Sequence, residues 1–169
     1  LSDVISLTKV TEITPDDNFL CVLPMFHSFA WTVCVLLPLY CGGTVVILES
    51  FQPGETISTV VNEGITFLLG VPSMYAVLLR KAEPEHFKKV RLAVSGGASL
   101  PVELYKAFAE KFPVNFVEGY GLTEAAPVVC LNPVDGIKKP GSIGLPLPGI
   151  SVIIGDDSGR EVPTGEVGE

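Results

Sequence analysis

The sequence predicts an α/β protein with a doubly wound, mostly parallel sheet, helices on both faces, and a short antiparallel hairpin at the end. Three observations carry this prediction. Apolar runs of strand length alternate five times with segments of helical periodicity, a pattern typical of parallel sheets with crossover helices. The runs are mostly continuous rather than alternating, as strands covered on both faces require. The 169 residues, 47% of them hydrophobic, suffice for one such domain.

The first strand, helix and strand are expected between Phe19 and Leu48, a stretch without Asp, Glu, Lys or Arg. A membrane span does not fit, because prolines and a Gly-Gly pair interrupt the stretch. Its longest helix-like piece, Phe29–Cys41, is also shorter than the about 17 residues that cross a bilayer. The runs Phe19–Leu23 and Thr44–Leu48 are rich in strand-forming residues. We therefore predict a buried strand, a buried helix and a second buried strand.

The same alternation continues to residue 117. Apolar residues recur at helical spacing from Val71 through Leu78 to Ala82, and Pro72 suits the first turn of that helix. The neighbouring segments follow the same two periodicities. The predicted helices are Glu55–Glu63, 71–82 and Pro101–Phe112, and the predicted strands are Thr66–Leu69, Val90–Val94 and Val114–Val117.

Beyond Pro127 the sequence changes character. Prolines and glycines break the stretch Pro140–Gly149, which excludes a helix there. Two short runs, Ser151–Ile154 and Arg160–Val162, flank the turn-forming residues Asp156–Gly159 and predict a hairpin. We expect a single α/β subdomain over residues 1–169, with βα repeats over 1–127 and a loop and hairpin region over 128–169.

The composition limits the function. The formal net charge is −8, and the 11 basic residues are scattered without forming a patch, so nucleic-acid binding is not expected. Cys21, Cys34, Cys41 and Cys130 lie in apolar runs without a C-x-x-C pair. They are interpreted as reduced core residues rather than zinc or disulfide partners. No Lys- or Arg-led signal peptide opens the chain, which favours a cytoplasmic location.

Three loops at predicted strand ends are candidate sites, because doubly wound sheets bind ligands at the carboxyl ends of their strands. The first loop, Leu23–Ser28, contains His27, and Trp31 follows four residues later. A single histidine without a paired acid more often has a structural role. Trp31 fits either the core or a pocket wall.

The second loop, Ser95–Ser99, contains a Gly-Gly pair and leads into a helix. Gly96 and Gly97 let a ligand approach the backbone closely, although a tight strand-to-helix turn would also require them. The motifs G-x-G-x-x-G, G-x-x-x-x-G-K-[ST] and G-x-S-x-G are absent. The sequence therefore gives no motif that would place the chain among nicotinamide-binding, P-loop or α/β-hydrolase proteins.

The third loop, Glu118–Glu124, places two glycines, an aromatic ring, a hydroxyl and a carboxylate after a strand. Tyr120 can lie against a purine, Thr123 can donate a hydrogen bond to a phosphate, and Glu124 offers an oxygen ligand to Mg²⁺. A helix capped by Thr123 would use the same residues without a ligand.

Together these motifs resemble the adenylate-forming acyl-CoA synthetase family, whose relatives include luciferases and peptide-synthetase adenylation domains. The resemblance covers essentially the whole chain. The segments in register are Leu23–His27, Ser95–Ala98, Gly119–Glu124, and Gly144–Gly149 with Gly165–Glu169. The resemblance implies a ligase in which a carboxylate attacks the α-phosphate of ATP, giving an acyl-adenylate and pyrophosphate, before the thiol of coenzyme A takes the acyl group. Residues 118–127 look more like those of bacterial fatty acyl-CoA ligases than like those of amino-acid adenylating domains, which implies a long-chain fatty acid as substrate.

The resemblance also implies roles for single residues. His27 would border the carboxylate of the acid, Trp31 would gate the acyl tunnel, and Glu124 would bind Mg²⁺. Thr123 would hold the α-phosphate and would form the catalytic set with His27 and Glu124. The nucleotide would contact Gly97, Ala98, Gly119, Tyr120, Gly121, Leu122 and Thr123, with Gly97 and Ala98 lining the adenine and Tyr120 stacking on it.

The family's phosphate loop, ribose-binding aspartate and small C-terminal domain with its catalytic lysine have no counterpart among the 169 residues. We therefore expect the chain, which starts at Leu1, to be a middle segment of a larger N-terminal domain and to be inactive alone. Two alternatives stay open: a module that binds nucleotide or acyl chains without turnover, and another adenylating enzyme, such as an aryl-CoA ligase or a peptide-synthetase domain. Peripheral membrane contact also stays open.

Overall fold

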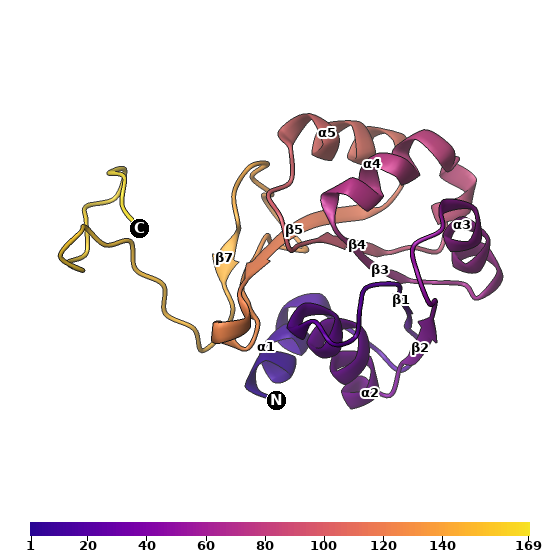
Figure 1. Ribbon diagram of the computed structural model, residues 1–169, viewed down its shortest axis with the longest axis horizontal. Coiled ribbons are helices and arrows are strands. Elements are labelled where there is room, and N and C mark those ends of the chain that lie inside the picture. Colours follow the sequence, from indigo (N-terminus) through magenta and orange to yellow (C-terminus); the bar gives the residue numbers. More distant parts are fainter.

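The computed structural model describes residues 1–169 and contains a seven-stranded sheet (Figure 1). The order of strands across it is β2-β1-β3-β4-β5-β6-β7. The first five strands are parallel to one another, and β6 and β7 add antiparallel pairs. The strands are β1 (Asn18–Cys21), β2 (Thr44–Ile47), β3 (Phe67–Gly70), β4 (Leu92–Ser95), β5 (Asn115–Gly121), β6 (Val128–Leu131) and β7 (Leu145–Pro146).

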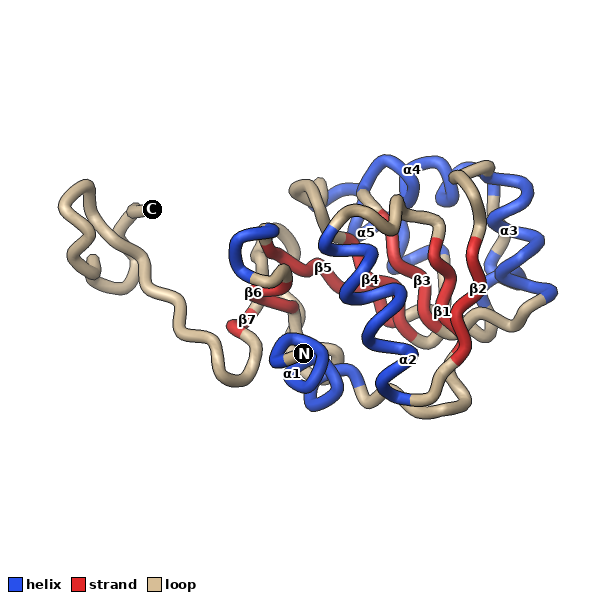
Figure 2. The backbone as a smooth tube through the Cα atoms, turned by 60° about the horizontal axis from the view of Figure 1, so that its bottom comes forward, coloured by secondary structure: helices blue, strands red, loops and turns tan.

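Helices cover both faces of the sheet, as Figures 1 and 2 show. The α-helices are α1 (Ser2–Thr11), α2 (Leu37–Cys41), α3 (Pro53–Asn62), α4 (Pro72–Lys81) and α5 (Val102–Lys111). A π-helix, η1 (Ala30–Leu36), runs directly into α2, and η2 (Pro84–Phe87) and η3 (Thr123–Ala125) are short 3₁₀ segments. Helices α1, η1 and α2 pack on one face, and α3, α4 and α5 pack on the other. The predicted doubly wound α/β class is confirmed.

The sheet separates two apolar layers, because successive side chains of a strand point to opposite faces. In β1, Phe19 joins the layer of α1 and η1, whereas Leu20 joins the layer of α3, α4 and α5. The ring of Phe19 stacks on that of Phe67 in β3, with centroids 4.3 Å apart. Burial on both faces explains why the strand sequences are continuously apolar.

The apolar stretch between residues 19 and 48 folds into β1, the continuous helix of η1 and α2, and β2, in the predicted order. The prediction that both strands are buried is wrong for β2, which lies at the edge of the sheet with Thr44 and Ile47 exposed. No helix of the structure is both long enough and apolar enough to cross a membrane. All four cysteines are free thiols; Cys41 is partly buried and the other three are buried, which fits their interpretation as core residues.

Helix α1 was not predicted from the sequence. Val4 and Leu7 pack its inner side against the sheet. The Val128 N–H donates a hydrogen bond to Asp3 Oδ2 at 2.8 Å, which ties α1 to β6. Burial raises the pKa of the Asp3 carboxyl.

The antiparallel end of the sheet is confirmed, but different residues build it. The predicted segments Ser151–Ile154 and Arg160–Val162 do not form regular strands, but they do pair around the predicted turn. An antiparallel bridge joins Gly155 to Glu161, and the Val162 N–H donates to the Ile154 carbonyl at 2.9 Å. Instead β6 pairs with β5 and β7. Residues 151–169 extend away from the sheet (Figure 1), and their backbone groups pair within the segment, as between Gly155 and Glu169, which exchange two hydrogen bonds of 2.8 and 2.9 Å.

Candidate functional site

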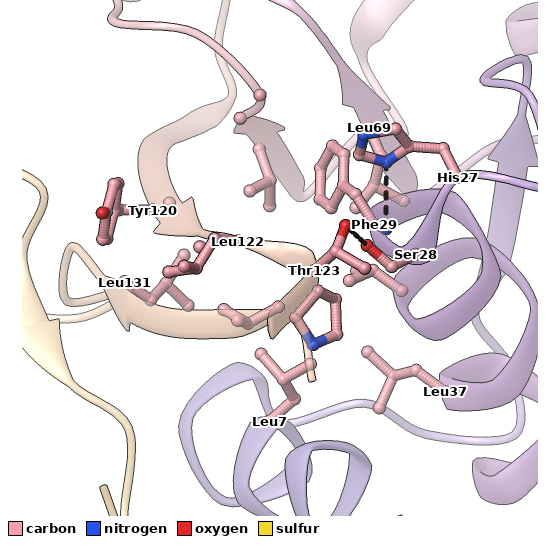
Figure 3. A pocket seen from close by; sticks show the side chains of 18 of the residues that line it. Leu7, His27, Ser28, Phe29, Leu37, Leu69, Tyr120, Leu122, Thr123 and Leu131 are labelled. Atoms are coloured by element: carbon pink, nitrogen blue, oxygen red, sulfur yellow. Dashed lines mark hydrogen bonds between the residues drawn. The ribbon is translucent and has the colours of Figure 1, made fainter. Parts of the chain in front are cut away.

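A cavity of about 200 Å³ opens at the carboxyl ends of β4 and β5, on the face covered by α1 and η1 (Figure 3). The helix after β1 lies on this face, whereas the helix after β3 lies on the opposite face. This change of face marks a switch point between β1 and β3, where doubly wound sheets bind ligands, and the cavity reaches it through His27 and Leu69. The apolar walls consist of Leu7, Phe29, Val33, Leu37, Phe67, Leu69, Val94, Val128 and Leu131.

Most of the predicted site residues line this cavity. They are His27, Gly97, Gly119, Tyr120, Gly121, Leu122 and Thr123. Three predicted residues, Trp31, Ala98 and Glu124, do not line it. Trp31 on η1 is 49% exposed, and Ala98 and Glu124 are exposed next to residues that do line it.

His27 lies at the mouth, directly before the helix that forms one wall. Its Nδ1 accepts a hydrogen bond from the Phe29 N–H at 3.2 Å. With Nδ1 acting as acceptor, a neutral His27 carries its proton on Nε2. The backbone carbonyl of His27 accepts from the Trp31 N–H at 3.0 Å. The exposed ring therefore has Nε2–H available as a donor to a ligand.

Two hydroxyl groups meet across the mouth. Ser28 Oγ and Thr123 Oγ1 lie 2.9 Å apart, as Figure 3 shows. Thr123 begins η3 but makes no capping hydrogen bond with its side chain, so the alternative of a Thr-capped helix is wrong. Ser28 was not predicted as a site residue. Its hydroxyl directly after His27 is the sequence signal that points to it.

Two glycines allow the backbone to shape the mouth. Gly97 has φ +77°, a conformation that residues with a Cβ rarely adopt. A Cβ on Gly121 would lie 1.8 Å from the Pro127 carbonyl oxygen, so no side chain fits there. Strand β5 continues through Gly121 and pairs with β6, whereas the sequence predicted a loop from Glu118 onward.

Glu118 joins the second and third predicted loops. Its buried Oε1 accepts a hydrogen bond from the Leu100 N–H at 2.9 Å. Its backbone carbonyl accepts from the Asn132 N–H at 2.9 Å. The Gly96–Gly97 turn, β5 and β6 are thereby held in one arrangement, which sequence patterns did not reveal.

The donor set limits how Mg²⁺ could be held. No three His, Cys, Asp or Glu side chains gather into a group that could hold a metal ion. Glu124 is a single exposed carboxylate one residue after Thr123. Nucleotide-bound Mg²⁺ usually takes one or two carboxylates, waters and phosphate oxygens. Glu124 thus fits a metal ion that a nucleotide mostly holds.

Comparison with known proteins gives consistent matches. The family model described as AMP-binding enzyme matches residues 1–169. Feruloyl-CoA synthase from Amycolatopsis sp is 36% identical over 164 residues, which cover 94% of this chain and 33% of that protein. A long-chain-fatty-acid–CoA ligase from Yersinia pestis is 38% identical over 161 residues, which cover 90% of this chain and 28% of that protein.

Among solved structures, the crystal structure of ATP-bound MatB from Rhodopseudomonas palustris matches with a TM-score of 0.93 at 31% identity. The match covers 99% of this chain and 33% of that one. The chain spans about a third of the length of the curated relatives it matches.

Proposed function

Because the chain belongs to the AMP-binding enzyme family, we propose that it is a segment of an ATP-dependent ligase that joins a long-chain fatty acid to coenzyme A. The segment would supply the acyl cavity and part of the nucleotide site in the middle of a larger N-terminal domain. The same proposal includes a cytoplasmic location and peripheral contact with a membrane.

The apolar cavity is the observation that supports the substrate. None of its lining residues is Asp, Glu, Lys or Arg, and His27, Ser28 and Thr123 lie together at the mouth. An acid with an apolar tail would bury the tail along these walls and keep its carboxylate at the mouth. A second anionic group or an α-ammonium would be buried without a partner, which is unfavourable. Malonate-like acids and amino acids are therefore disfavoured.

In the first step a carboxylate oxygen bonds to the α-phosphorus of ATP and pyrophosphate leaves. His27 Nε2–H would orient the carboxylate, and the Thr123 hydroxyl would donate to an α-phosphate oxygen as charge grows there. Tyr120, with a ring 44% exposed, would cover one face of the adenine. Glu124 would share a Mg²⁺ ion with the phosphates, and this ion would neutralise charge. Such positioning and charge stabilisation supply most of the catalysis in phosphoryl transfer.

In the second step the sulfur of coenzyme A bonds to the acyl carbon and AMP leaves. The walls made by η1 and the sheet exclude water from the acyl tail. They keep the carbonyl at the mouth, where the thiol must arrive. Exclusion of water also limits hydrolysis of the acyl-adenylate.

A panel of acids tests this proposal in the complete enzyme that contains residues 1–169. Pyrophosphate release would be measured with saturated acids of increasing chain length, ferulate, malonate and a mixture of amino acids. We expect the highest kcat/KM with long saturated acids. A higher kcat/KM with malonate or an amino acid would overturn the assignment of substrate.

An aryl acid is the second candidate. Phe29 and Phe67 place aromatic rings in the cavity wall, and aromatic substrates pack well against such rings. The similarity to a feruloyl-CoA synthase supports this alternative. Ferulate exceeding every saturated acid in kcat/KM would select it.

A further inference from the structure

The hydroxyl of Ser28 has no assigned role, although it bridges two parts of the site. Ser28 and Thr123 are 95 positions apart in sequence, yet their hydroxyl oxygens lie 2.9 Å apart. Ser28 begins the helical segment that forms one wall, and Thr123 opens the turn after β5. The bond therefore links the two sides of the cavity mouth (Figure 3).

Stability does not explain this contact. The Ser28–Thr123 bond is exposed, so water would satisfy either hydroxyl if the partner were removed. Exposed hydrogen bonds of this kind contribute little to the net stability of a fold. A role in orienting a side chain at the mouth is the better explanation.

The proton count allows one arrangement that would serve this role. Each hydroxyl has one proton, and either oxygen of the pair can be the donor. When Ser28 donates to Thr123 Oγ1, the Thr123 proton is directed to a third oxygen. A hydroxyl that accepts one hydrogen bond becomes a stronger donor in the next.

We propose that Ser28 is a positioning residue that donates to Thr123 Oγ1 and so aims the Thr123 hydroxyl at the α-phosphate. This inference rests on the proposed adenylation function. It adds a residue that acts through Thr123 and does not itself touch the nucleotide.

The test uses Ser28→Ala, Ser28→Thr, Thr123→Ala and the double variant Ser28→Ala/Thr123→Ala in the complete enzyme, with pyrophosphate release as the readout. Ser28→Ala should lower kcat by about tenfold, less than the loss of a direct transition-state donor, with the KM for the acid within twofold. Ser28→Thr keeps the hydroxyl and should restore most of the rate. In the Thr123→Ala background, Ser28→Ala should have no further effect.

Ser58→Ala is the matched control, because Ser58 is an exposed serine on α3 whose hydroxyl donates to the Glu55 carbonyl. It should leave kcat and both KM values unchanged. Two outcomes with an active wild type would overturn the role of Ser28 but not the proposed function. One is a Ser28→Ala rate within twofold of the wild-type rate, and the other is a double variant whose loss is the product of the two single losses. A wild type that adenylates no acid overturns the proposed function and this inference with it. Thermal melting of each variant shows whether a lost rate reflects a lost fold.

Discussion

Asp17 anchors the amino-terminal ends of three strands through charge. Arg91 donates to both of its carboxylate oxygens, from Nε at 2.8 Å and from the terminal nitrogen at 2.6 Å. Thr66 Oγ1 donates to the same carboxylate at 2.7 Å. Although burial opposes the charge, these partners hold the pKa of Asp17 at about 2. The carboxylate is therefore favoured in the folded protein over the unfolded chain.

This pKa predicts a stability change at acid pH. The folded pKa of Asp17 lies below its usual value of 3.8, so the stabilisation is complete above about pH 5 and is lost as the pH falls toward 2, by about 2 kcal/mol. Asp17→Asn should destabilise the protein at pH 7 and flatten this slope. Urea unfolding from pH 7 to pH 2 measures both effects. The exposed neighbour variant Asp16→Asn should follow the wild type, and parallel slopes for Asp17→Asn and wild type would contradict the assignment.

Glu124 is the residue whose charge matters most to the proposed chemistry. Glu124→Gln keeps the size but removes a ligand charge, and we expect the rate of adenylation to fall about a hundredfold at saturating Mg²⁺. The melting temperature should not change, because Glu124 is exposed. Pyrophosphate release by the complete enzyme is the readout. Glu110→Gln on the surface of α5 is the control, and near-normal release by Glu124→Gln would remove Glu124 from the metal site.

At the scale of elements, the contact between β5 and β6 depends on a missing side chain. Gly121→Ala places a Cβ 1.8 Å from the Pro127 carbonyl oxygen, so the strands must separate. We expect a loss of more than about 3 kcal/mol in the free energy of unfolding. Gly54→Ala in α3 meets no atom within 4 Å and should stabilise the protein by about 0.5 kcal/mol. Denaturant unfolding distinguishes them, and equal effects would contradict the packing argument.

The elements also show what sequence patterns can and cannot reveal. β1 and β3 were predicted because a strand that is buried on both faces requires a continuous run of apolar residues. β7 was missed because two residues are too few to show a periodicity. β6 was missed although its four residues are apolar and buried, because it follows β5 directly, without the helix that the alternating pattern leads one to expect. Ser151–Ile154 has a strand-like composition but pairs with residues 160–162 only through one bridge and single hydrogen bonds outside the sheet, so local propensity overestimated the strand there.

Some residues of the candidate site could be predicted from the sequence and others could not. His27, Gly97 and Thr123 follow predicted strands, and the strand-end rule correctly brought them together. Leu7 and Ser28 also line the cavity, but their places depend on how α1 and η1 dock on the sheet. Trp31 was predicted as a gate and is half-exposed outside the lining; its role stays a prediction.

At the scale of the whole molecule, the chain covers only part of the length of its relatives, and this predicts whether it is active on its own. The chain spans about a third of those proteins, so we expect purified residues 1–169 to release no pyrophosphate from ATP and fatty acid. Pyrophosphate assays with the complete enzyme as the positive control measure this. Turnover by the isolated chain would contradict the prediction. Trp31, the single tryptophan, reports ATP titration by fluorescence, and binding without turnover would support the alternative of a binding module.

The cavity walls have an evolutionary consequence. Leu37, Phe67 and Leu69 line the cavity and also belong to the core layer on that face of the sheet. A substitution that widens the cavity, such as Leu37→Ala, removes core packing and costs about 2 to 5 kcal/mol, a large share of the about 5 to 15 kcal/mol that keeps a domain folded. Under the proposed acyl-binding role of the cavity, a lineage that changes its acid preference by this route needs stabilising substitutions elsewhere. The free energy of unfolding that exceeds what the fold requires thus limits how fast such substitutions can accumulate.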